Sequence, residues 1–560
     1  MKQAFPDNLP KLLVAAAKNF PSHGIGFVNP DHSIRFSEFP EILEESRSIL
    51  AALQAKGLKK GDVVILSLSK NEEIIPVLWG CFMGGIIPAL LQPPVSFTRY
   101  NPAAGKAEKI FRQLGCPIVI VSKEYAGNWR SCNIPSGRLL DVAGLHGNPN
   151  LATEAELKHE DLALIQFSSG STGDPKGVML THRNIIINTM DIITGIGLEP
   201  GDVAVNWMPL CHDMGLIGFH ITPVFAGVTQ YFLDPVDFVK NPSLWIETMS
   251  LKKCTITACP NFGQMLVSRF LSRRTTPDWD LSPVRILFNG AEPISVAMMR
   301  IFMRDMKKFQ LDPAAMFPAY GLAEATLAVT FPERLGETLV KSFRRDDLIG
   351  HGFAIETDPG EANTMELVNL GRTIEHCSLL VADDMDRPVM NGMVGNLLVK
   401  GENVTKGYYG KTGLTSSLFS DEWLHTGDLG FVHHGDLFIT GRSKDIIFIN
   451  GINYYALDLE NIALQMEELS PGKIVIAGCF DDAEGRDKLL IFLVGTANET
   501  THSLCRKIKN HFATHIGLSA ETFILVKSNE IPRTGSGKIQ RYKLVDRYLK
   551  GGFSHLVHIQ

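Results

Sequence analysis

Residues 168–177 read Ser-Ser-Gly-Ser-Thr-Gly-Asp-Pro-Lys-Gly and bring hydroxyl groups, glycines and a lysine together in one short stretch. Glycines let backbone N–H groups approach an anion, hydroxyl groups add hydrogen-bond donors, and a lysine supplies positive charge for phosphate. These residue types predict a phosphate-binding loop. Its candidate nucleotide-binding residues are Ser168, Ser169, Gly170, Ser171, Thr172, Gly173 and Lys176.

An apolar run, residues 162–167, precedes this loop and predicts a short buried strand. A strand, a phosphate loop and then a helix is the arrangement in which many α/β proteins bind nucleotides, so we expect a helix directly after the loop. The loop is not a Walker A loop, because Pro175 stands where that pattern has the glycine before the lysine. Since such a composition is also typical of an ordinary turn, other motifs must decide its role.

Further polar blocks follow along the chain. Residues 319–326 place Tyr320 and Glu324 on either side of a Gly-Leu-Ala stretch. Asp428 comes directly after Gly427, Arg442 directly after Gly441, and Lys538 closes the glycine-rich run Thr-Gly-Ser-Gly-Lys. Carboxylates, cations and an aromatic ring, each beside glycine, are suited to holding a nucleotide and its charge.

In this order the blocks resemble the adenylate-forming superfamily of acyl-CoA synthetases, peptide-synthetase adenylation domains and luciferases, over nearly the whole chain. Within it the resemblance is strongest to the fatty acyl-AMP ligases. Three stretches carry that resemblance: Cys-His-Asp-Met-Gly-Leu-Ile-Gly at 211–218, the alanine in Tyr-Gly-Leu-Ala-Glu-Ala-Thr at 320–326, and Gly-Ile-Asn-Tyr-Tyr at 451–455. The polar stretch Pro332–Glu366, which we expect to be irregular, occupies the place of the insertion that is characteristic of those ligases.

The resemblance implies roles for individual residues. ATP and a carboxylic acid would react at the α-phosphate to give acyl-AMP and pyrophosphate. Lys538 would bridge the carboxylate and the α-phosphate, and Glu324 would hold Mg²⁺. Tyr320 and Gly321 would bind adenine, Asp428 the ribose hydroxyls with Arg442 nearby, and the loop with Lys176 the β- and γ-phosphates. Gly290 and Ala291, which follow a predicted strand at 284–288, complete the candidate nucleotide site.

His212 is a further candidate, either at the entrance of the acyl pocket or as a satisfied polar residue near the core. Asp213 stands close to the position at which amino-acid-activating relatives pair an aspartate with the α-ammonium group. Because His-Asp-Met-Gly is also usual in the fatty acyl ligases, we give little weight to a pairing of Asp213 with an α-ammonium group.

The resemblance also implies a pantetheine thiol as the acyl acceptor. In coenzyme-A-using relatives the small domain rotates about a hinge just after the Gly-Arg pair, a position held here by Lys444. Fatty acyl-AMP ligases use an acyl carrier protein instead, and we find no Asp-Ser-Leu attachment site in the chain. We therefore expect a separate carrier protein. The alternatives are an acyl-CoA synthetase, an amino or aryl acid activating enzyme, and a catalytically silent lipid-binding protein of the same fold.

Composition sets broader limits. The chain has 560 residues, too many for one ordinary core, and its formal net charge of −6 predicts no broad basic field for nucleic acid. Nine scattered cysteines form no Cys-x-x-Cys pair, so their spacing indicates neither a cysteine zinc site nor a disulfide framework. Cysteines without such a framework favour a reducing, cytoplasmic compartment. No apolar stretch is long enough to cross a bilayer.

The pattern of elements predicts an α/β fold. A large N-terminal domain, residues 1–442, would contain mixed sheets with covering helices and a β subdomain from about 365 to 440, with its insertion at about 332–366. A small mobile α+β domain, residues 443–560, would carry Lys538. Predicted elements include strands at 63–66 and 117–121 and helices at 74–84, 297–308 and 459–469.

Overall fold

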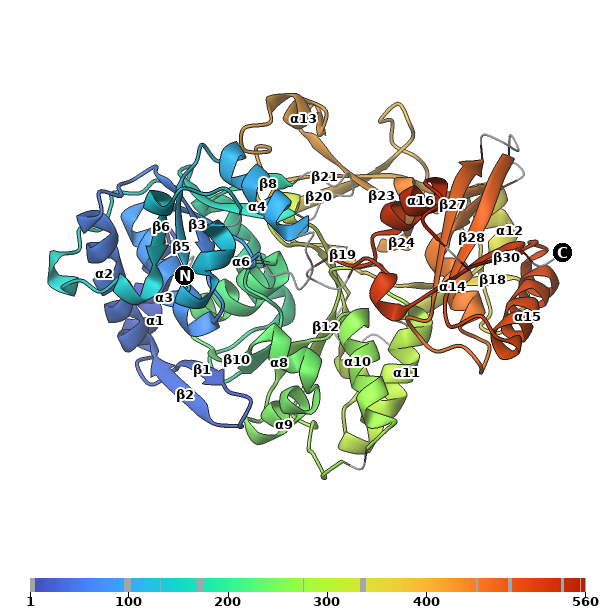
Figure 1. The fold of residues 1–560 in the computed structure, drawn as a ribbon, viewed down its shortest axis with the longest axis horizontal. Helices are drawn as coiled ribbons and strands as arrows, with labels where there is room; N and C mark the ends of the chain where they lie inside the picture. The colour runs from blue at the N-terminus through green and yellow to red at the C-terminus, as the bar shows by residue number, and fades with distance from the viewer. Residues whose placement is uncertain are drawn as a thin grey trace.

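The computed structural model describes residues 6–94, 102–130, 132–168, 175–274, 276–332, 339–449, 452–481, 486–534, 538–553 and 555–558. In Figure 1 the N-terminal half of the chain lies at the left and the C-terminal residues lie at the right, with residues of the middle of the chain between them. None of the helices in the described part of the chain combines the length and apolar character needed to cross a membrane.

Two largely parallel sheets dominate the N-terminal half. One has the order β4-β3-β5-β6 and is parallel throughout, as the alternation of apolar runs and helices predicts. The other has the order β13-β12-β11-β9-β10-β1-β2 and is parallel except at β1–β2. Their strands are β4 (Ile87–Leu90), β3 (Val63–Ser67), β5 (Ile118–Val121), β6 (Leu139–Asp141), β13 (Met316–Pro318), β12 (Ile286–Asn289), β11 (Ile256–Ala258), β9 (Val203–Asn206), β10 (Thr229–Leu233), β1 (Gly24–Val28) and β2 (Ile34–Glu38).

Helices surround these sheets because each has an apolar face to bury. The predicted helix at 74–84 is the end of α3 (Asn71–Gly84), and the one at 297–308 is α11 (Val296–Met306). Helix α6 (His182–Ile196) begins with a capping box in which Thr181 and Asn184 exchange hydrogen bonds.

The predicted β subdomain is a five-stranded antiparallel sheet. Its order is β20-β21-β23-β22, with β24 paired to β23. Its strands are β20 (Cys377–Ala382), β21 (Gly395–Gly401), β22 (Phe419–Ser420), β23 (Trp423–His433) and β24 (Asp436–Arg442).

The stretch Pro332–Glu366 is not the irregular segment that its polar composition predicted. Residues 333–338 lie outside the described residues, but much of the remainder forms regular structure: β16 (Val340–Arg344), α12 (Arg345–Gly350), β17 (Glu356–Thr357) and β18 (Thr364–Val368). The strands pair in the order β17-β16-β18. A small core explains the order, because Phe343, Leu348 and Met365 are buried against Phe431 and Phe438 of the β subdomain.

The C-terminal residues form a sheet of order β27-β28-β29-β30. Its strands are β27 (Ile474–Asp481), β28 (Arg486–Val494), β29 (Thr522–Val526) and β30 (Leu556–His558), and its helices are α14 (Ala456–Ala463), α15 (Glu499–Ile516) and α16 (Arg541–Leu549). Two separate apolar clusters occupy this unit, one containing residues of α14 and α15 and the other containing Leu544 of α16. Helix α14 ends before the predicted Leu469, although Leu469 is still buried in the first cluster.

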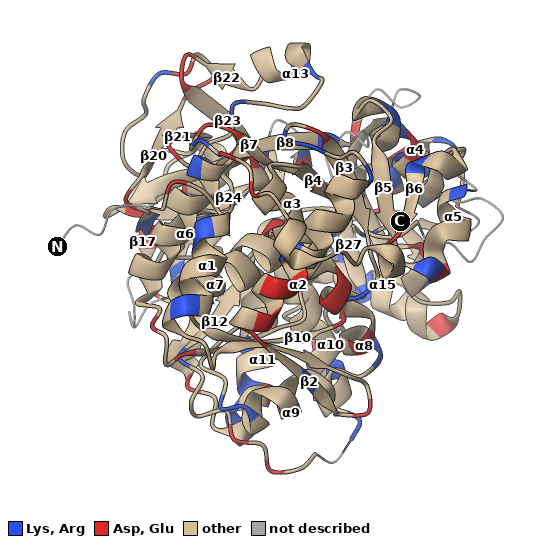
Figure 2. Cartoon of the chain, turned by 90° about the vertical axis from the view of Figure 1, so that its left-hand side faces the viewer, with Lys and Arg blue, Asp and Glu red and all other residues tan. Residues whose placement is uncertain are grey.

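In Figure 2 the positions of acidic and basic residues, red and blue on the ribbon, are interspersed over the visible part of the chain.

Candidate active site

A cavity of about 1000 Å³ lies between the large N-terminal part and the C-terminal unit. It is lined by residues of both, and it brings together most of the predicted site. Those lining residues are Lys176, His212, Gly290, Ala291, Tyr320, Gly321, Glu324, Arg442 and Lys538. Asp428 joins them from a smaller adjoining cavity that Tyr320, Arg442 and Lys538 also line.

The predicted phosphate loop connects two antiparallel strands, β7 (Leu162–Ser168) and β8 (Lys176–Thr181), and the Cα of Ser168 pairs with that of Lys176. The expectation of a helix directly after the loop is wrong. The apolar residues of β8 pair with β7 as a hairpin, and the helix α6 begins only at His182. Residues Ser169, Gly170, Ser171, Thr172 and Gly173 lie outside the described residues.

Lys176 lies at the base of this hairpin. Its Nζ is 5.1 Å from the centre of the Tyr408 ring, a cation–π distance. Burial lowers the pKa of the Lys176 ammonium, and the nearby Glu324 carboxylate opposes that effect. An anion entering the cavity would therefore meet a cation that lacks full hydration.

Tyr320, Asp428 and Arg442 form one hydrogen-bonded group. The Tyr320 hydroxyl donates to one oxygen of Asp428 at 2.8 Å, and Arg442 Nε donates to the other at 2.8 Å. Strand pairing explains the second contact, because Asp428 on β23 lies opposite Arg442 on β24. Asp428 is buried, and its interaction with Arg442 raises the pKa of the guanidinium. The group fixes an aromatic ring, a carboxylate and a cation at one end of the cavity.

Glu324 lies in a short helical turn, η8 (Ala323–Ala325), and its Oε1 accepts a hydrogen bond of 2.8 Å from the Tyr408 hydroxyl. Its backbone carbonyl accepts a bond of 2.8 Å from the Thr405 N–H. Sequence reasoning missed Tyr408, which contacts both Glu324 and Lys176. The run Gly-Tyr-Tyr-Gly at 407–410 was the available signal.

Backbone shape at two glycines lets the chain line the cavity closely. A Cβ at Gly290 would lie 2.8 Å from the Ala319 carbonyl oxygen, and one at Gly321 would lie 1.7 Å from the Leu327 carbonyl oxygen. Ala291 follows Gly290 with a positive φ of 67°. These positions require little or no side chain, which leaves backbone groups next to the cavity.

Lys538 reaches the cavity from the C-terminal unit. Its backbone is held by Thr534, which donates its N–H to the Lys538 carbonyl at 2.8 Å and accepts the Lys538 N–H on Oγ1 at 3.1 Å. Residues 535–537 lie outside the described residues. Burial lowers the pKa of the Lys538 ammonium, and the Arg442 guanidinium lowers it further.

Polar contacts join the C-terminal unit, which carries Lys538, to the N-terminal part. Ser295 Oγ donates to Asn461 Oδ1 at 2.7 Å, and Arg269 donates to the Pro471 carbonyl at 3.1 Å. Arg345 of the insertion, which is buried, forms an ion pair with Asp458 of α14. The stretch Pro332–Glu366 thus contacts the C-terminal unit directly.

His212 and Asp213 form an ion pair beside the cavity, with 2.7 Å between Nδ1 and Oδ1. Burial opposes the charged imidazole, but the Asp213 carboxylate outweighs it and raises the pKa of His212. The same contact keeps the pKa of Asp213 below its ordinary value despite burial. Asp213 is therefore already engaged by a side chain of the protein itself.

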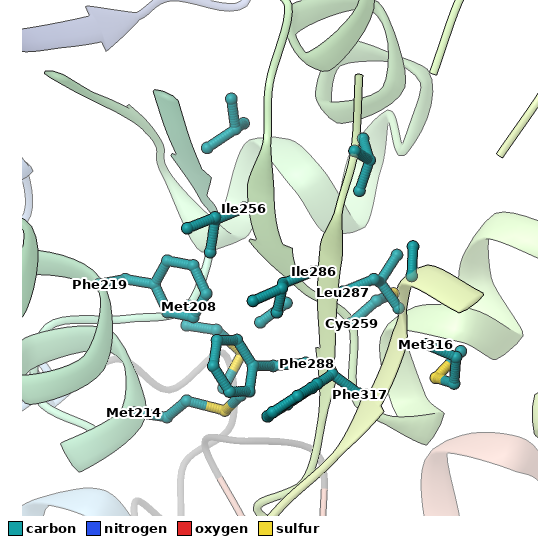
Figure 3. Packing of buried hydrophobic residues seen from close by; sticks show 14 of the residues in the cluster. Met208, Met214, Phe219, Ile256, Cys259, Ile286, Leu287, Phe288, Met316 and Phe317 are labelled. Atoms are coloured by element: carbon teal, nitrogen blue, oxygen red, sulfur yellow. The ribbon is translucent and has the colours of Figure 1, made fainter. Parts of the chain in front are cut away.

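The remainder of the cavity is largely apolar. Phe219, Ile256 and Phe288 line it, and Figure 3 shows these side chains packed with Met214 and Phe317. Phe288 meets Phe219 and Phe317 edge-on, at centroid distances of 6.0 and 5.2 Å. Residues of α6 and the segment after it extend this apolar lining: Ile192, Ile196 and Leu198.

Comparisons with known proteins agree with this arrangement. JamA of Moorena producens, described as a medium-chain-fatty-acid–[acyl-carrier-protein] ligase, is 27% identical over 546 residues, which is 93% of this chain and 91% of JamA. The long-chain-fatty-acid–AMP ligase FadD26 of Mycobacterium tuberculosis is 29% identical over 544 residues, 91% of each chain.

A solved structure described as "Structural and Functional Studies of Fatty Acyl-Adenylate Ligases from E. coli and L. pneumophila" matches with a TM-score of 0.89 and 28% identity, over 98% of both chains. The resemblance to fatty acyl-AMP ligases and the predicted α/β fold are confirmed. The family described as AMP-binding enzyme matches residues 16–409. The chain belongs to this family of AMP-binding enzymes and is an adenylate-forming ligase.

Proposed function

We propose that this enzyme activates a fatty acid with ATP to acyl-AMP, releasing pyrophosphate, and then transfers the acyl group to the pantetheine thiol of a separate acyl carrier protein. One observation carries the proposal. A single cavity joins a polar end, containing Lys176, Glu324 and Lys538, to a long apolar part lined by residues such as Phe219 and Ile256. A fatty acid has the same division into a reactive charged head and an apolar chain.

The polar end suits the chemistry of adenylation. An acyl carboxylate oxygen attacks the α-phosphorus, and the bond from that phosphorus to the pyrophosphate leaving group breaks. Because both reactants are anionic, the site must neutralise charge and hold them in line. Lys538 would contact the carboxylate and the α-phosphate, and Lys176 with the loop from Ser168 would contact the β- and γ-phosphates.

The group of Tyr320, Asp428 and Arg442 would bind the nucleoside. The Tyr320 ring would stack on adenine, with Gly321 beside it, and Asp428 would accept hydrogen bonds from the ribose hydroxyls. The close backbone at Gly290 and Ala291 would border the same nucleoside.

Glu324 fits a magnesium ion, because a hard cation prefers oxygen ligands and Tyr408 fixes one carboxylate oxygen within the cavity. Bound Mg²⁺ would neutralise phosphate charge. His212 would lie at the entrance to the acyl part.

The lining supports a fatty acid over an amino acid. An α-ammonium group needs a carboxylate, but Asp213 is engaged by His212 at 2.7 Å. Adding one methylene in an apolar pocket changes binding by only about 1–3 kcal/mol, so the lining favours the class of acid without selecting one chain length.

The acceptor follows from how the C-terminal unit is held. In relatives, transfer to coenzyme A requires the small C-terminal domain to rotate about a hinge. In this chain that domain would be residues 443–560, and Lys444 occupies the hinge position. The insertion at 332–366 would resist that rotation, because Arg345 pairs with Asp458 and Phe343 shares a small core with Tyr455. JamA, which is described as a medium-chain-fatty-acid–[acyl-carrier-protein] ligase and is similar to this chain over 91% of its own length, supports the same acceptor.

The test is pyrophosphate release by the purified enzyme across a panel of fatty, aryl and amino acids. The product is then identified after addition of coenzyme A or a holo carrier protein. We expect release with fatty acids and acylation of the carrier. Preference for amino or aryl acids would contradict the substrate class, and efficient acyl-CoA synthesis would identify a synthetase instead.

A further inference from the structure

Three side chains with metal-ligating atoms meet where the insertion contacts the β subdomain. They are Glu356 of β17, His433 at the end of β23 and His434 in the following turn. Their ligand atoms all lie within 4.8 Å of one another. None of the three lines the cavity of the candidate active site, so the cluster has no part in the proposed adenylation.

The fold places Glu356 and His433 together. In the β16–β17 pair, Glu356 lies opposite Phe343, which is fully buried. The Phe343 ring packs edge-on against the His433 ring, with 5.5 Å between centroids. As a result Glu356 Oε2 lies 2.7 Å from His433 Nε2, across the boundary between the insertion and the β subdomain.

The turn that carries His434 is unusual. His433 pairs with Asp436, so His434 and Gly435 form a two-residue hairpin loop, and both have positive φ values, 53° and 89°. A hairpin turn with both central residues at positive φ favours Asn, Asp or Gly at the first position. Histidine there accepts a less favourable backbone, and its ring lies 4.2 Å from the His433 ring. The turn therefore brings a second imidazole next to that of His433.

The charge of the cluster also suits a cation. Lys341 Nζ contacts both oxygens of Glu356 at 3.0 Å. A metal ion would therefore compete with the Lys341 ammonium for the Glu356 carboxylate.

We propose that Glu356, His433 and His434 bind a divalent transition-metal ion, with Zn²⁺ as the best match. Two imidazoles and one carboxylate are a common ligand set for zinc, with water completing the tetrahedron. Mg²⁺ and Ca²⁺ prefer oxygen ligands alone, which separates this site from the magnesium proposed at Glu324. A bound ion would link the insertion to the β23–β24 turn.

The test uses tag-free, metal-stripped full-length enzyme and equilibrium dialysis against Zn²⁺, with bound metal measured by elemental analysis. We expect one zinc ion per chain at this site, and at least a tenfold loss of affinity in His434→Asn. Asparagine is favoured in this turn, so the hairpin is kept while the ligand is lost. His351→Asn, an exposed histidine of the same insertion, is the matched control and should bind zinc as the parent does.

Two further measurements sharpen the result. Lys341→Met should bind zinc more tightly than the parent, because the competing ammonium is gone. Co²⁺ bound in place of zinc should give a spectrum of nitrogen and oxygen ligands without a thiolate charge-transfer band, which separates this site from the nine cysteines of the chain. Equal zinc affinity in His434→Asn and parent, a thiolate band, or no stoichiometric binding would each overturn the proposal.

Discussion

Lys538 carries the strongest electrostatic argument among the residues of the cavity. Burial and Arg442 lower the pKa of its ammonium, so the protein alone does not stabilise that charge fully. The anionic carboxylate and phosphate of the reactants would supply the missing stabilisation. A cation prepared in this way interacts most strongly with the charge that develops during the reaction.

We expect Lys538→Ala to abolish most acyl-AMP formation and to leave ATP binding largely intact. Loss of one preorganised contact to the transition state costs roughly 10²–10³ in rate. Pyrophosphate release and a separate nucleotide-binding measurement distinguish the two effects. Lys550→Ala is the control, because Lys550 pairs with Asp546 on the exposed surface near the end of α16. A loss smaller than tenfold in Lys538→Ala would remove this residue from the catalytic role.

Glu324→Gln should raise the Mg²⁺ concentration needed for half-maximal adenylation and depress the rate. A neutral amide is a weaker ligand for a hard cation than a carboxylate is. Tyr408→Phe retains the carboxylate and removes only the hydrogen bond of 2.8 Å that orients it, so its effect on the Mg²⁺ titration should be smaller. Superimposable titration curves for Glu324→Gln and the parent would refute the assignment.

Among the elements, the short strands next to the cavity depend on close backbone contact. Strand β14 (Tyr320–Gly321) pairs with β15 (Ala328–Phe331) through an irregular register that brings Gly321 against the Leu327 carbonyl. The same strand positions Tyr320 for its bond to Asp428. A side chain at residue 321 would therefore displace β14 and with it the Tyr320 hydroxyl that binds Asp428.

Gly321→Ala should lower the free energy of unfolding by about 1–3 kcal/mol, because the added methyl group overlaps backbone atoms that cannot move independently. Gly105→Ala is the matched control. Gly105 lies within helix α4 (Pro102–Gln113), where an added methyl group would point into open space, so alanine there should stabilise by about 0.5–1 kcal/mol. Urea unfolding of the two variants measures both values. If Gly321→Ala were as stable as the parent protein, β14 would relax freely around the added methyl group.

Continuous apolar runs made β3, β5 and β12 predictable, and helical periodicity did the same for α3 and α11. The order of the strands was not predictable, because β10 lies between β9 and β1 through contacts far apart in the sequence. The strand at 162–167 is β7, but the sequence predicts a helix where the structure has β8, since a short apolar run has no period of its own. The helix predicted at 459–469 is too long at its end, because apolar residues after Ala463 still pack on the core although α14 ends there.

The types and order of the residues beside glycine predicted that they would lie together, as they do around the two adjoining cavities. Tyr408 was not, because its importance comes from two contacts, to Glu324 and Lys176, that only the folded chain creates. The structure of the insertion was hidden for a similar reason. Its few apolar residues are sufficient for a core only when Phe431 and Phe438 of another element complete it.

At the scale of the whole molecule, the two units meet through polar contacts of different kinds. Arg345–Asp458 joins the insertion to α14, whereas Ser295–Asn461 and Arg269–Pro471 join the large sheet's helices to the C-terminal unit. A rotation that removed Lys538 from the cavity would have to break them. Removing one partner of a buried ion pair costs about 3–5 kcal/mol, because the other charge is left without compensation. A bias of this size changes the equilibrium constant between two states by a factor of about 10² to 4 × 10³.

We therefore expect the parent enzyme to load a holo carrier protein and to make little acyl-CoA, and Arg345→Ala and Asp458→Ala to raise acyl-CoA formation while adenylation survives. Shortening the insertion within 332–366 should act in the same direction. Arg300→Ala is the matched control, because Arg300 pairs with Glu366 at 2.6 Å and so ties the insertion to α11 rather than to the C-terminal unit. Acyl-CoA and acyl-carrier products are measured side by side, with pyrophosphate release as the measure of adenylation.

If folded variants adenylate normally and still reject coenzyme A, the acceptor is selected elsewhere, by the absence of a pocket for the coenzyme A nucleotide. If the parent makes acyl-CoA efficiently, the insertion does not restrain rotation, and the carrier-protein acceptor is wrong.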